Sequence, residues 1–579
     1  MKVVLIRYRR SSSRVKFMDF QRVFIFLGLA VTGYFLILTW QQDYGSTTAT
    51  VVPPTVPQEE SALGGSLPDA SAEIDASVPE LSTIPTMPLS AANPKTQMPS
   101  KPLISVETDV LQARINPVGG DIVAVALPAF PKTLEQADQP LLLVSDFNSY
   151  QLQSGLIGPD GIDKAGNRPV FITERVDYEL SDGDELRVGL TPTLDDENEL
   201  SVQKEYVFRS GDYLVDVSYE VVNRGSVPKT MAFFGQIKRD AQPPQEQDTN
   251  IFTLQPFIGG ATRREDERYF KIDLEDLDEA PYQYDFTGGY VAFLQHYFLT
   301  AWVPSRDQIV RYFAKPAAGS AGLYTIGYTA APITIAPGER IKLGAQLYMG
   351  PKDQPRLASI AEGLDLTVDY GFLWFIAQPL FSGLTWIFDG VGNWGVAIIL
   401  LTVFVKILLY PLSAAGFKSM ARMRKLTPEM TRLRERYAED RQKLGQAMMD
   451  LYKKEKVNPL GGCFPLLLQM PVFLALYWTL MESVELRQAP FIGWITDLSA
   501  MDPYFVLPIL MGISMYLTQM MQPEPPDPMQ AKVFKFMPIM FTGFMLWFPS
   551  GLVLYWLVNN VLSVLQQLYV TRQVELGRD

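Results

Sequence analysis

The chain has 579 residues, 47% of them hydrophobic, and a formal net charge of −13. Cys463 is the only cysteine and His296 the only histidine, which excludes an internal disulfide and argues against a Ser-His-Asp triad or a common zinc site. Residues 42–365 hold 46 Asp+Glu and 25 Lys+Arg (46 − 25, a balance of −21), which argues against nucleic acid as a partner of this acidic middle.

The first hundred residues predict a membrane anchor and a linker. Residues 1–22 are basic, and residues 23–40 form an uncharged apolar run with no small-residue cleavage site next to it. An uncleaved helix is therefore favoured over a signal peptide, and its basic end is expected in the cytoplasm. Met18 is an alternative start. Residues 41–100 are rich in Pro, Ser, Thr and Ala, which indicates a disordered linker.

Residues 101–365 have the pattern of an all-β domain. Alternating runs such as residues 201–208 and 213–222 are separated by turn signals such as residues 223–225. Period-two patterning with frequent turns predicts a sandwich. The acidic run at 265–267 lacks EF-hand spacing, so a solvated face is favoured over a calcium site. The pattern does not locate a peptide-binding cleft in this domain.

The rest of the chain predicts a membrane part. Aromatic residues mixed with polar ones at 366–391 indicate an amphipathic helix in the membrane interface. Five apolar segments of residues 392–579 read as transmembrane helices, giving six spans with the anchor. We place them near residues 392–412, 464–481, 504–521, 534–548 and 551–570.

Loop charges give the expected topology. The loop at 413–458 holds twelve Lys+Arg and six Asp+Glu, whereas residues 482–503 hold one base and four acids. By the positive-inside rule the first loop and both termini are cytoplasmic, and the acidic domain is outside.

Lys406 is the one charge inside the segment at 392–412. Thr402, Lys406 and Tyr410 are spaced by four and predict one polar helix face. An intramembrane charge is a functional candidate, with snorkelling to the membrane surface as the alternative. Other polar side chains within the apolar segments form interhelical hydrogen bonds or, with Thr402 and Lys406, line a wet cavity. They are Gln469, Gln519, Asn559 and Asn560.

The loop at 413–458 predicts a cytoplasmic helical hairpin. Two apolar seams join near Asp440, and Thr427-Pro428 suits an N-cap with Pro at the first helical position. Arg432 and Arg434 belong to a basic face that meets anionic lipid or ribosomal RNA, or is simply solvated. Methionines of the loop are candidates for an adaptable apolar surface. They are Met420, Met423, Met430 and Met448.

Several long motifs resemble the YidC-type membrane protein insertases, in the form with a large periplasmic domain. They are Gly392-Asn393-Trp394-Gly395, Tyr410-Pro411-Leu412, residues 456–465, Gln469-Met470-Pro471, residues 483–491 and residues 548–555. The resemblance implies a periplasmic β-supersandwich and five core helices around a hydrophilic groove. It also implies an inner-membrane location and nascent chains, the ribosome, the signal-recognition pathway and the Sec translocon as partners.

The family's key positive position falls on Lys406, where many members have Arg. Thr402, Tyr555 and Trp556 match further polar or aromatic positions, and Gln469 and Asn559 complete the expected client-contacting groove. We therefore predict an energy-independent insertase and chaperone, without catalytic residues, metal or cofactor, that works with membrane lipids and no DNA.

Two other classes of function compete. The first is a small-solute transporter with Lys406 in its binding site, although the chain shows no matching halves. The second is a periplasmic binding module with a passive anchor, which six spans argue against.

Overall fold

A computed structural model describes residues 102–576, apart from residues 165, 182, 195–198, 245–255, 318–321, 438–439, 456, 458–463 and 523–527. The predicted anchor at 23–40, the linker at 41–100, Met18 and Cys463 lie outside the described residues.

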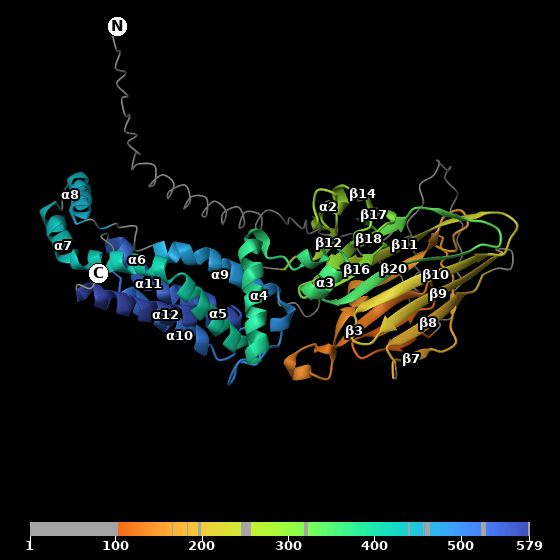
Figure 1. The fold of residues 1–579 in the computed structure, drawn as a ribbon, viewed down its shortest axis with the longest axis horizontal. Coiled ribbons are helices and arrows are strands. Elements are labelled where there is room, and N and C mark those ends of the chain that lie inside the picture. The colour runs from red at the N-terminus through yellow and green to blue at the C-terminus, as the bar shows by residue number, and fades with distance from the viewer. Residues whose placement is uncertain are drawn as a thin grey trace, which may run out of the picture. The chain divides into compact units, whose positions relative to one another are not determined.

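The acidic part of the chain forms two antiparallel-rich sheets (Figure 1). The 11-stranded sheet has the order β14-β17-β18-β11-β5-β3-β2-β1-β7, with β19 paired to β11 and β4 to β3. The 9-stranded sheet has the order β13-β12-β15-β16-β20-β10-β9-β8-β6. The prediction of an all-β domain is thus confirmed.

The strands of the larger sheet are β1 (Ile104–Glu107), β2 (Gln112–Asn116), β3 (Asp121–Pro131), β4 (Pro140–Val144), β5 (Gln151–Ile157), β7 (Asp177–Glu179), β11 (Lys229–Asp240), β14 (Tyr282–Thr287), β17 (Ile309–Pro316), β18 (Leu323–Ala330) and β19 (Ile333–Ile335). Those of the smaller sheet are β6 (Phe171–Ile172), β8 (Glu185–Pro192), β9 (Leu200–Arg209), β10 (Leu214–Asn223), β12 (Gly259–Thr262), β13 (Phe270–Ile272), β15 (Val291–Leu294), β16 (Phe298–Val303) and β20 (Arg340–Pro351).

One apolar core joins the two sheets. Val125 and Leu152 from the larger sheet and Val217, Tyr219 and Trp302 from the smaller one belong to the same buried cluster. Because successive strand residues point to opposite faces, alternate residues of each strand enter this core. Burying each such side chain contributes ~1.5–3 kcal/mol.

The remaining elements are helical. They are α2 (Asp276–Glu279), α3 (Gln354–Ile360), α4 (Trp374–Val391), α5 (Trp394–Leu408), α6 (Tyr410–Lys425), α7 (Thr427–Arg436), α8 (Arg441–Lys454), α9 (Phe464–Glu482), α10 (Val506–Met520), α11 (Pro528–Met545) and α12 (Ser550–Glu575). Short 3-10 turns at Leu364–Thr367 and Gly371–Leu373 link α3 to α4.

Helix α5, which carries Lys406, is held at its start. The Asn393 side chain accepts a hydrogen bond from the Val396 amide at 3.0 Å and so caps the helix. Trp394 and Leu401 are buried in a cluster with Leu552 of α12. Gly395 lies so close to the Phe491 ring that a Cβ has no room there. The sequence of this helix therefore fixes which face meets its neighbours.

The predicted helix at 392–412 is not continuous at its end, although residues 394–408 are helical as predicted. Helix α5 ends at Leu408, and α6 begins at Tyr410 after a bend of 68°. Pro411 stands in the first turn of α6, where its ring is tolerated, but it disfavours continuation of the preceding helix.

By length and composition, two helices of the described residues can cross a membrane, at Gly371–Val391 and Ser550–Glu575, or three if the bent pair α5 and α6 counts as one span. The first of these includes α4, which the sequence pattern assigns to the interface.

The end of α9 and the loop between α9 and α10 contact the β-domain. The Arg487 guanidinium donates to the Pro131 carbonyl oxygen at 2.8 Å. The Lys352 ammonium lies 3.7 Å from the Glu482 carboxylate, and both side chains are nearly buried. Val484 belongs to the sandwich core cluster. The β-domain is therefore packed on this loop as well as joined to it through the chain.

Candidate functional site

The Lys406 side chain reaches α9 and α12 from α5. Its ammonium donates to the Ser563 hydroxyl oxygen at 2.7 Å and lies 3.5 Å from the amide oxygen of Gln469. No carboxylate of the described residues pairs with it. The charge is half-buried among neutral dipoles and is not neutralised by a counter-ion there.

A small pocket surrounds this lysine. Its volume of about 10 Å³ corresponds to one water molecule. Five of the six residues predicted for the groove line it, together with residues that the sequence did not single out. The lining residues are Thr402, Val405, Lys406, Leu409, Ser413, Gln469, Tyr555 and Asn559.

Neighbouring polar side chains hold the walls of the pocket. The Thr402 hydroxyl donates to the Ile398 carbonyl oxygen at 2.6 Å within its own helix. The Ser563 hydroxyl donates to the Asn559 carbonyl oxygen at 2.7 Å and accepts from Lys406. Both hydroxyl groups therefore already donate to carbonyl oxygens of their own helices, which leaves the Lys406 ammonium as the strongest donor in the pocket.

Ser563 was missed by sequence reasoning, although a signal for it exists. Asn559, Ser563 and Gln567 follow one another at intervals of four, and all three are buried on one face of α12. A polar stripe inside an apolar helix indicates a face turned to other helices.

Trp556 does not line the pocket. It packs against Phe473 of α9 with ring centroids 4.2 Å apart, and against Phe541 of α11 at 4.8 Å. The neighbouring Tyr555 is the one that faces Lys406. Trp556 therefore joins α9, α11 and α12 by aromatic packing.

Tyr410 does not lie on the polar helix face that its spacing predicts. The bend after α5 puts Tyr410 in the first turn of α6, where its side chain is exposed and lines no part of the pocket. The prediction of a three-residue face holds for Thr402 and Lys406 only.

The predicted hairpin consists of α7 and α8. Asp440 accepts a hydrogen bond from the Lys443 amide at 3.0 Å and caps α8, close to the expected junction. Helix α7 starts at Thr427, one residue before the expected Pro428, and its N-cap is Leu426, so the predicted Thr427 cap is wrong. Met430 is buried, and its sulfur accepts from the Tyr452 hydroxyl at 4.0 Å.

The other hairpin candidates differ in exposure. Arg432 is exposed, whereas Arg434, Met423 and Met448 are half-buried. Met420 is buried with Phe417 of α6 against Val570 of α12. It therefore belongs to helix packing and is not part of an accessible methionine surface.

Comparisons with known proteins bear on the whole chain. The family model of the YidC periplasmic domain matches residues 103–382, and that of the 60Kd inner membrane protein matches residues 386–577. The membrane protein insertase YidC of Stutzerimonas stutzeri (strain A1501) is 46% identical over 564 residues, which cover 97% of this chain and 99% of that protein. That of Pseudomonas entomophila (strain L48) is 46% identical over 561 residues, with 96% and 99% covered.

A solved structure of an active YidC insertase with its first transmembrane domain resolved covers 81% of this chain and 92% of its own, with 17% identity and a TM-score of 0.37. The assignment to a family rests on the family models and the sequence relatives. On these grounds the chain belongs to the YidC family of membrane protein insertases, inner-membrane proteins with a periplasmic domain.

Proposed function

We propose that Lys406 is the group through which this insertase engages acidic parts of its clients. The supporting observation is a cation that has no carboxylate partner among the described residues and that donates to the neutral side chains of Ser563 and Gln469 between the helices. Such a group attracts a carboxylate more strongly than an exposed lysine does, because water screens it less.

The free energy of the contact between Lys406 and a client carboxylate is limited. A carboxylate at ~4 Å gains up to ~4 kcal/mol at an effective dielectric of ~20. Part of this is lost because both charges give up water. The contact is therefore transient, as it must be for a client that has to leave.

The pocket has to open for this to occur. A volume of about 10 Å³ admits no peptide segment. We propose that α5, α9 and α12 separate around Lys406 and form the hydrophilic groove, and that apolar helix faces then receive the client helix. The relatives described above are membrane protein insertases and give no support to the transporter interpretation.

We further propose six spans, with both termini cytoplasmic and the β-domain in the periplasm. Helix α10 has 15 residues, or ~22 Å, which is short for a ~30 Å hydrocarbon core and favours a thinned membrane. In Figure 1, α4 runs across the direction of α5, α9 and α12, and Trp386 on it is 78% exposed. Both features support α4 as an interfacial helix.

Partners are part of the same proposal. We assign nascent membrane proteins as clients, for which the protein also acts as a chaperone. The ribosome and the signal-recognition pathway are expected at the basic hairpin, with the Sec translocon and membrane lipids as further partners. Exposed Arg432 on α7 is suited to phosphate groups of either RNA or lipid.

The test uses purified protein in proteoliposomes and two single-span clients that differ only by Asp→Asn in the translocated segment. Lys406→Ala should slow the Asp client about tenfold more than the Asn client, since only the Asp client loses a charge contact. Lys406→Arg should be tolerated and Lys406→Glu should not. Lys532→Ala, a change at an exposed lysine of α11, is the matched control. Equal losses for both clients would mean that Lys406 is structural.

A further inference from the structure

We propose that the loop between α9 and α10 lies in the periplasmic leaflet of the membrane and binds lipid through a patch of large apolar side chains, which we call the loop patch. The loop patch consists of Ile492, Trp494, Met501, Tyr504 and Phe505, which are between 40% and 69% exposed. Its sequence, with one base and four acids in residues 482–503, predicts a loop in water. Large exposed apolar patches, by contrast, mark binding surfaces.

The carboxylates of this loop accept hydrogen bonds within it. Asp497 accepts from the amide and from the hydroxyl of Ser499, each at 2.7 Å. Asp502 is 1% exposed and accepts from the Trp494 indole at 2.9 Å. None of the exposed residues among positions 488–505 is charged. The surface that this part of the loop presents is therefore uncharged, although its sequence contains acids.

The opposite side of the loop is packed against the helices. Ile495 and Leu498 belong to the buried cluster that contains Ile398 of α5 and Leu552 of α12. The Gly551 amide donates to the Leu498 carbonyl oxygen at 2.9 Å, which fixes the loop to the start of α12. The loop thus has apolar side chains on two sides, and the described residues cover only one of them.

The position of the loop patch identifies what covers the other side. Helix α10 follows it directly at Val506, and Ile509 and Ile513 continue the exposed apolar surface along one face of this apolar helix. In an inner-membrane protein such a face meets lipid. Because Arg487 of the same loop contacts Pro131 of the β-domain, which matches the YidC periplasmic domain, the loop patch stands at the periplasmic leaflet.

The kinds of side chain fit the boundary between lipid and water. Tyr504 and Trp494 each carry a polar group on an apolar ring, and such residues are enriched at the level of lipid headgroups. Phe505 adopts a left-handed backbone conformation with a φ of 57°, which is unfavourable for a bulky side chain. Burial of its ring in lipid offsets that cost. A protein partner fits less well, because protein interfaces have a polar rim.

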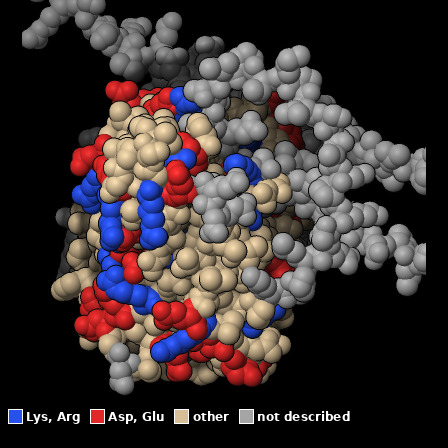
Figure 2. Space-filling view, turned by 90° about the vertical axis from the view of Figure 1, so that its right-hand side faces the viewer, with Lys and Arg blue, Asp and Glu red and all other residues tan. Residues whose placement is uncertain are grey.

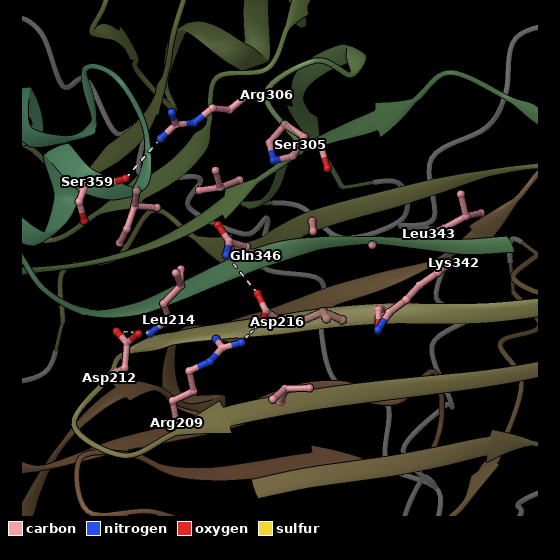
Figure 3. Close-up of a pocket in the computed structure, with 18 of the residues that line it drawn as sticks. Arg209, Asp212, Leu214, Asp216, Ser305, Arg306, Lys342, Leu343, Gln346 and Ser359 are labelled. Carbon is pink, nitrogen blue, oxygen red and sulfur yellow. Dashed lines mark hydrogen bonds and ion pairs between the residues drawn. The ribbon is translucent and has the colours of Figure 1, made fainter. Parts of the chain in front are cut away.

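A surface of the β-domain that meets water has a different composition. On the nine-stranded sheet Arg187 forms an ion pair with Glu205, and Figure 3 shows Arg209 and Asp216 facing each other in a hollow of this sheet. Figure 2 shows Lys and Arg side chains beside Asp and Glu side chains on one face of the molecule. Charged groups of this kind are absent from the exposed positions of residues 488–505, which supports lipid and not water as their surroundings.

The experiment places an environment-sensitive dye on the loop patch of the full-length protein in liposomes. Cys463 is the only cysteine, so Cys463→Ser combined with Ile492→Cys or with Tyr504→Cys leaves one thiol for a nitrobenzoxadiazole label. The liposomes contain phosphatidylcholine and phosphatidylglycerol, with bromine on the acyl chains either near the headgroup or near the chain end. We expect bromine near the headgroup to quench both labels, their emission to shift to the blue, and quenching by aqueous iodide to be lost.

Two control positions of equal exposure bracket this result, since Ile513 and Val227 are both 52% exposed. A label at Ile513→Cys, about two turns further along α10, should be quenched most by bromine near the chain end. A label at Val227→Cys in the β-domain should be quenched by iodide only.

The proposal is overturned if the two labels on the loop patch behave like the label in the β-domain. It is also overturned if they are shielded from iodide only after a client protein is added, because the patch is then a protein-docking surface. Lys406 takes no part in this measurement, so a failure of the function proposed above leaves the result unaffected.

Discussion

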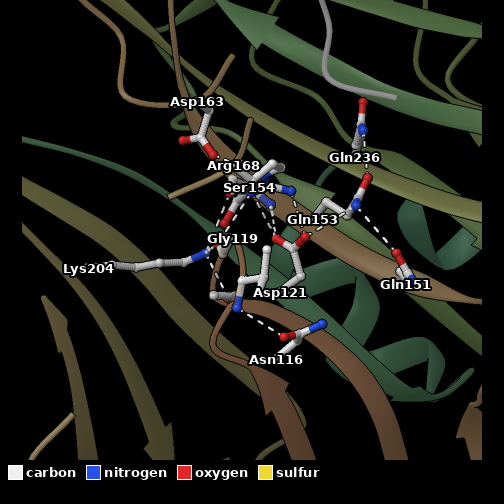
Figure 4. Close-up of polar contacts among 12 residues, drawn as sticks. Asn116, Gly119, Asp121, Gln151, Gln153, Ser154, Asp163, Arg168, Lys204 and Gln236 are labelled. Carbon is white, nitrogen blue, oxygen red and sulfur yellow. Dashed lines mark hydrogen bonds and ion pairs between the residues drawn. The ribbon is translucent and has the colours of Figure 1, made fainter. Parts of the chain in front are cut away.

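At the residue scale, Lys204 is a base in the interior of the β-domain. Its ammonium donates to the Gly120 carbonyl oxygen at 2.8 Å, beside Arg168, which pairs with Asp121 at 2.6 Å and with Asp163 at 2.9 Å (Figure 4). Two carboxylates and one guanidinium carry a net charge of −1, which a protonated lysine balances. Burial lowers the pKa of Lys204 to about 7, and Asp121 opposes this shift.

This pKa predicts a pH-dependent stability. Between a pH of about 7 and the usual lysine pKa of 10.5, Lys204 is protonated in the unfolded chain and deprotonated in the folded domain. The unfolded state binds more protons, so the free energy of unfolding rises with pH in this window and is flat with respect to Lys204 below it. From pH 7 to ~9.5 the gain is roughly 3 kcal/mol.

Lys204→Met should remove that rise. It also lowers stability at every pH, because the hydrogen bonds to the Gly119 and Gly120 carbonyl oxygens are lost. The measurement is urea unfolding of the full-length protein in detergent, followed by the loss of β-sheet circular dichroism at several pH values. Identical slopes in the two proteins would show that Lys204 is not the titrating group.

At the element scale, the chain between α5 and α9 divides into two parts with different roles. Helix α6 is part of the helical core, since Phe417 and Met420 are buried against Val570, and the Lys425 ammonium donates to the Val574 carbonyl oxygen at 3.1 Å. Helices α7 and α8 pack on each other through Met430. A deletion that tests the hairpin should therefore spare α6.

We predict that a flexible linker in place of residues 427–455 abolishes insertion and leaves the melting temperature of the helical part unchanged. Removal of residues 413–458 should lower the melting temperature as well, because each large buried side chain that is lost costs ~2–5 kcal/mol. Thermal unfolding and proteoliposome insertion check the two effects separately. Normal growth of cells that depend on the shorter deletion would contradict the proposed role of α7 and α8.

At the scale of the whole molecule, the contacts of the β-domain decide at which residue a deletion of this domain should end. A deletion ending near Ala330 leaves β20 without β10 and β16 and exposes Leu343 and Leu347. An unpaired apolar strand favours aggregation. The better boundary lies after Pro351, where Lys352 stays beside Glu482.

We therefore expect a protein lacking residues 45–351 to keep most insertion activity and to remain monodisperse, whereas one lacking residues 45–330 aggregates. Size-exclusion chromatography and the client assay compare the two. Complete loss of insertion by a monodisperse protein lacking 45–351 would show that the domain takes part in insertion itself. The lost Arg487 contact with Pro131 should lower the stability of the α9–α10 loop in both.

Much of the architecture could be predicted because it depends on local properties. Period-two alternation such as that at 213–222 predicted strands, and β10 follows at Leu214–Asn223. Hydropathy marked apolar segments, and α9 begins at Phe464 as expected. The spacing of Thr402 and Lys406 sufficed to place both in one pocket, because four residues make about one helical turn.

What the tertiary structure alone decided depends on residues far apart in the chain. The bend at Leu409 takes Tyr410 off the predicted face, and Ser563 on α12 supplies the nearest partner of Lys406. Lys204, in a strand predicted from alternation, is buried because Asp121 of β3 and Arg168 of the loop between β5 and β6 lie beside it. The pairing of β8, β9, β10 and β20 likewise joins residues that are far apart in the chain. Periodicity reports which face of an element is apolar, but only the packing of elements decides which polar groups meet on the other side.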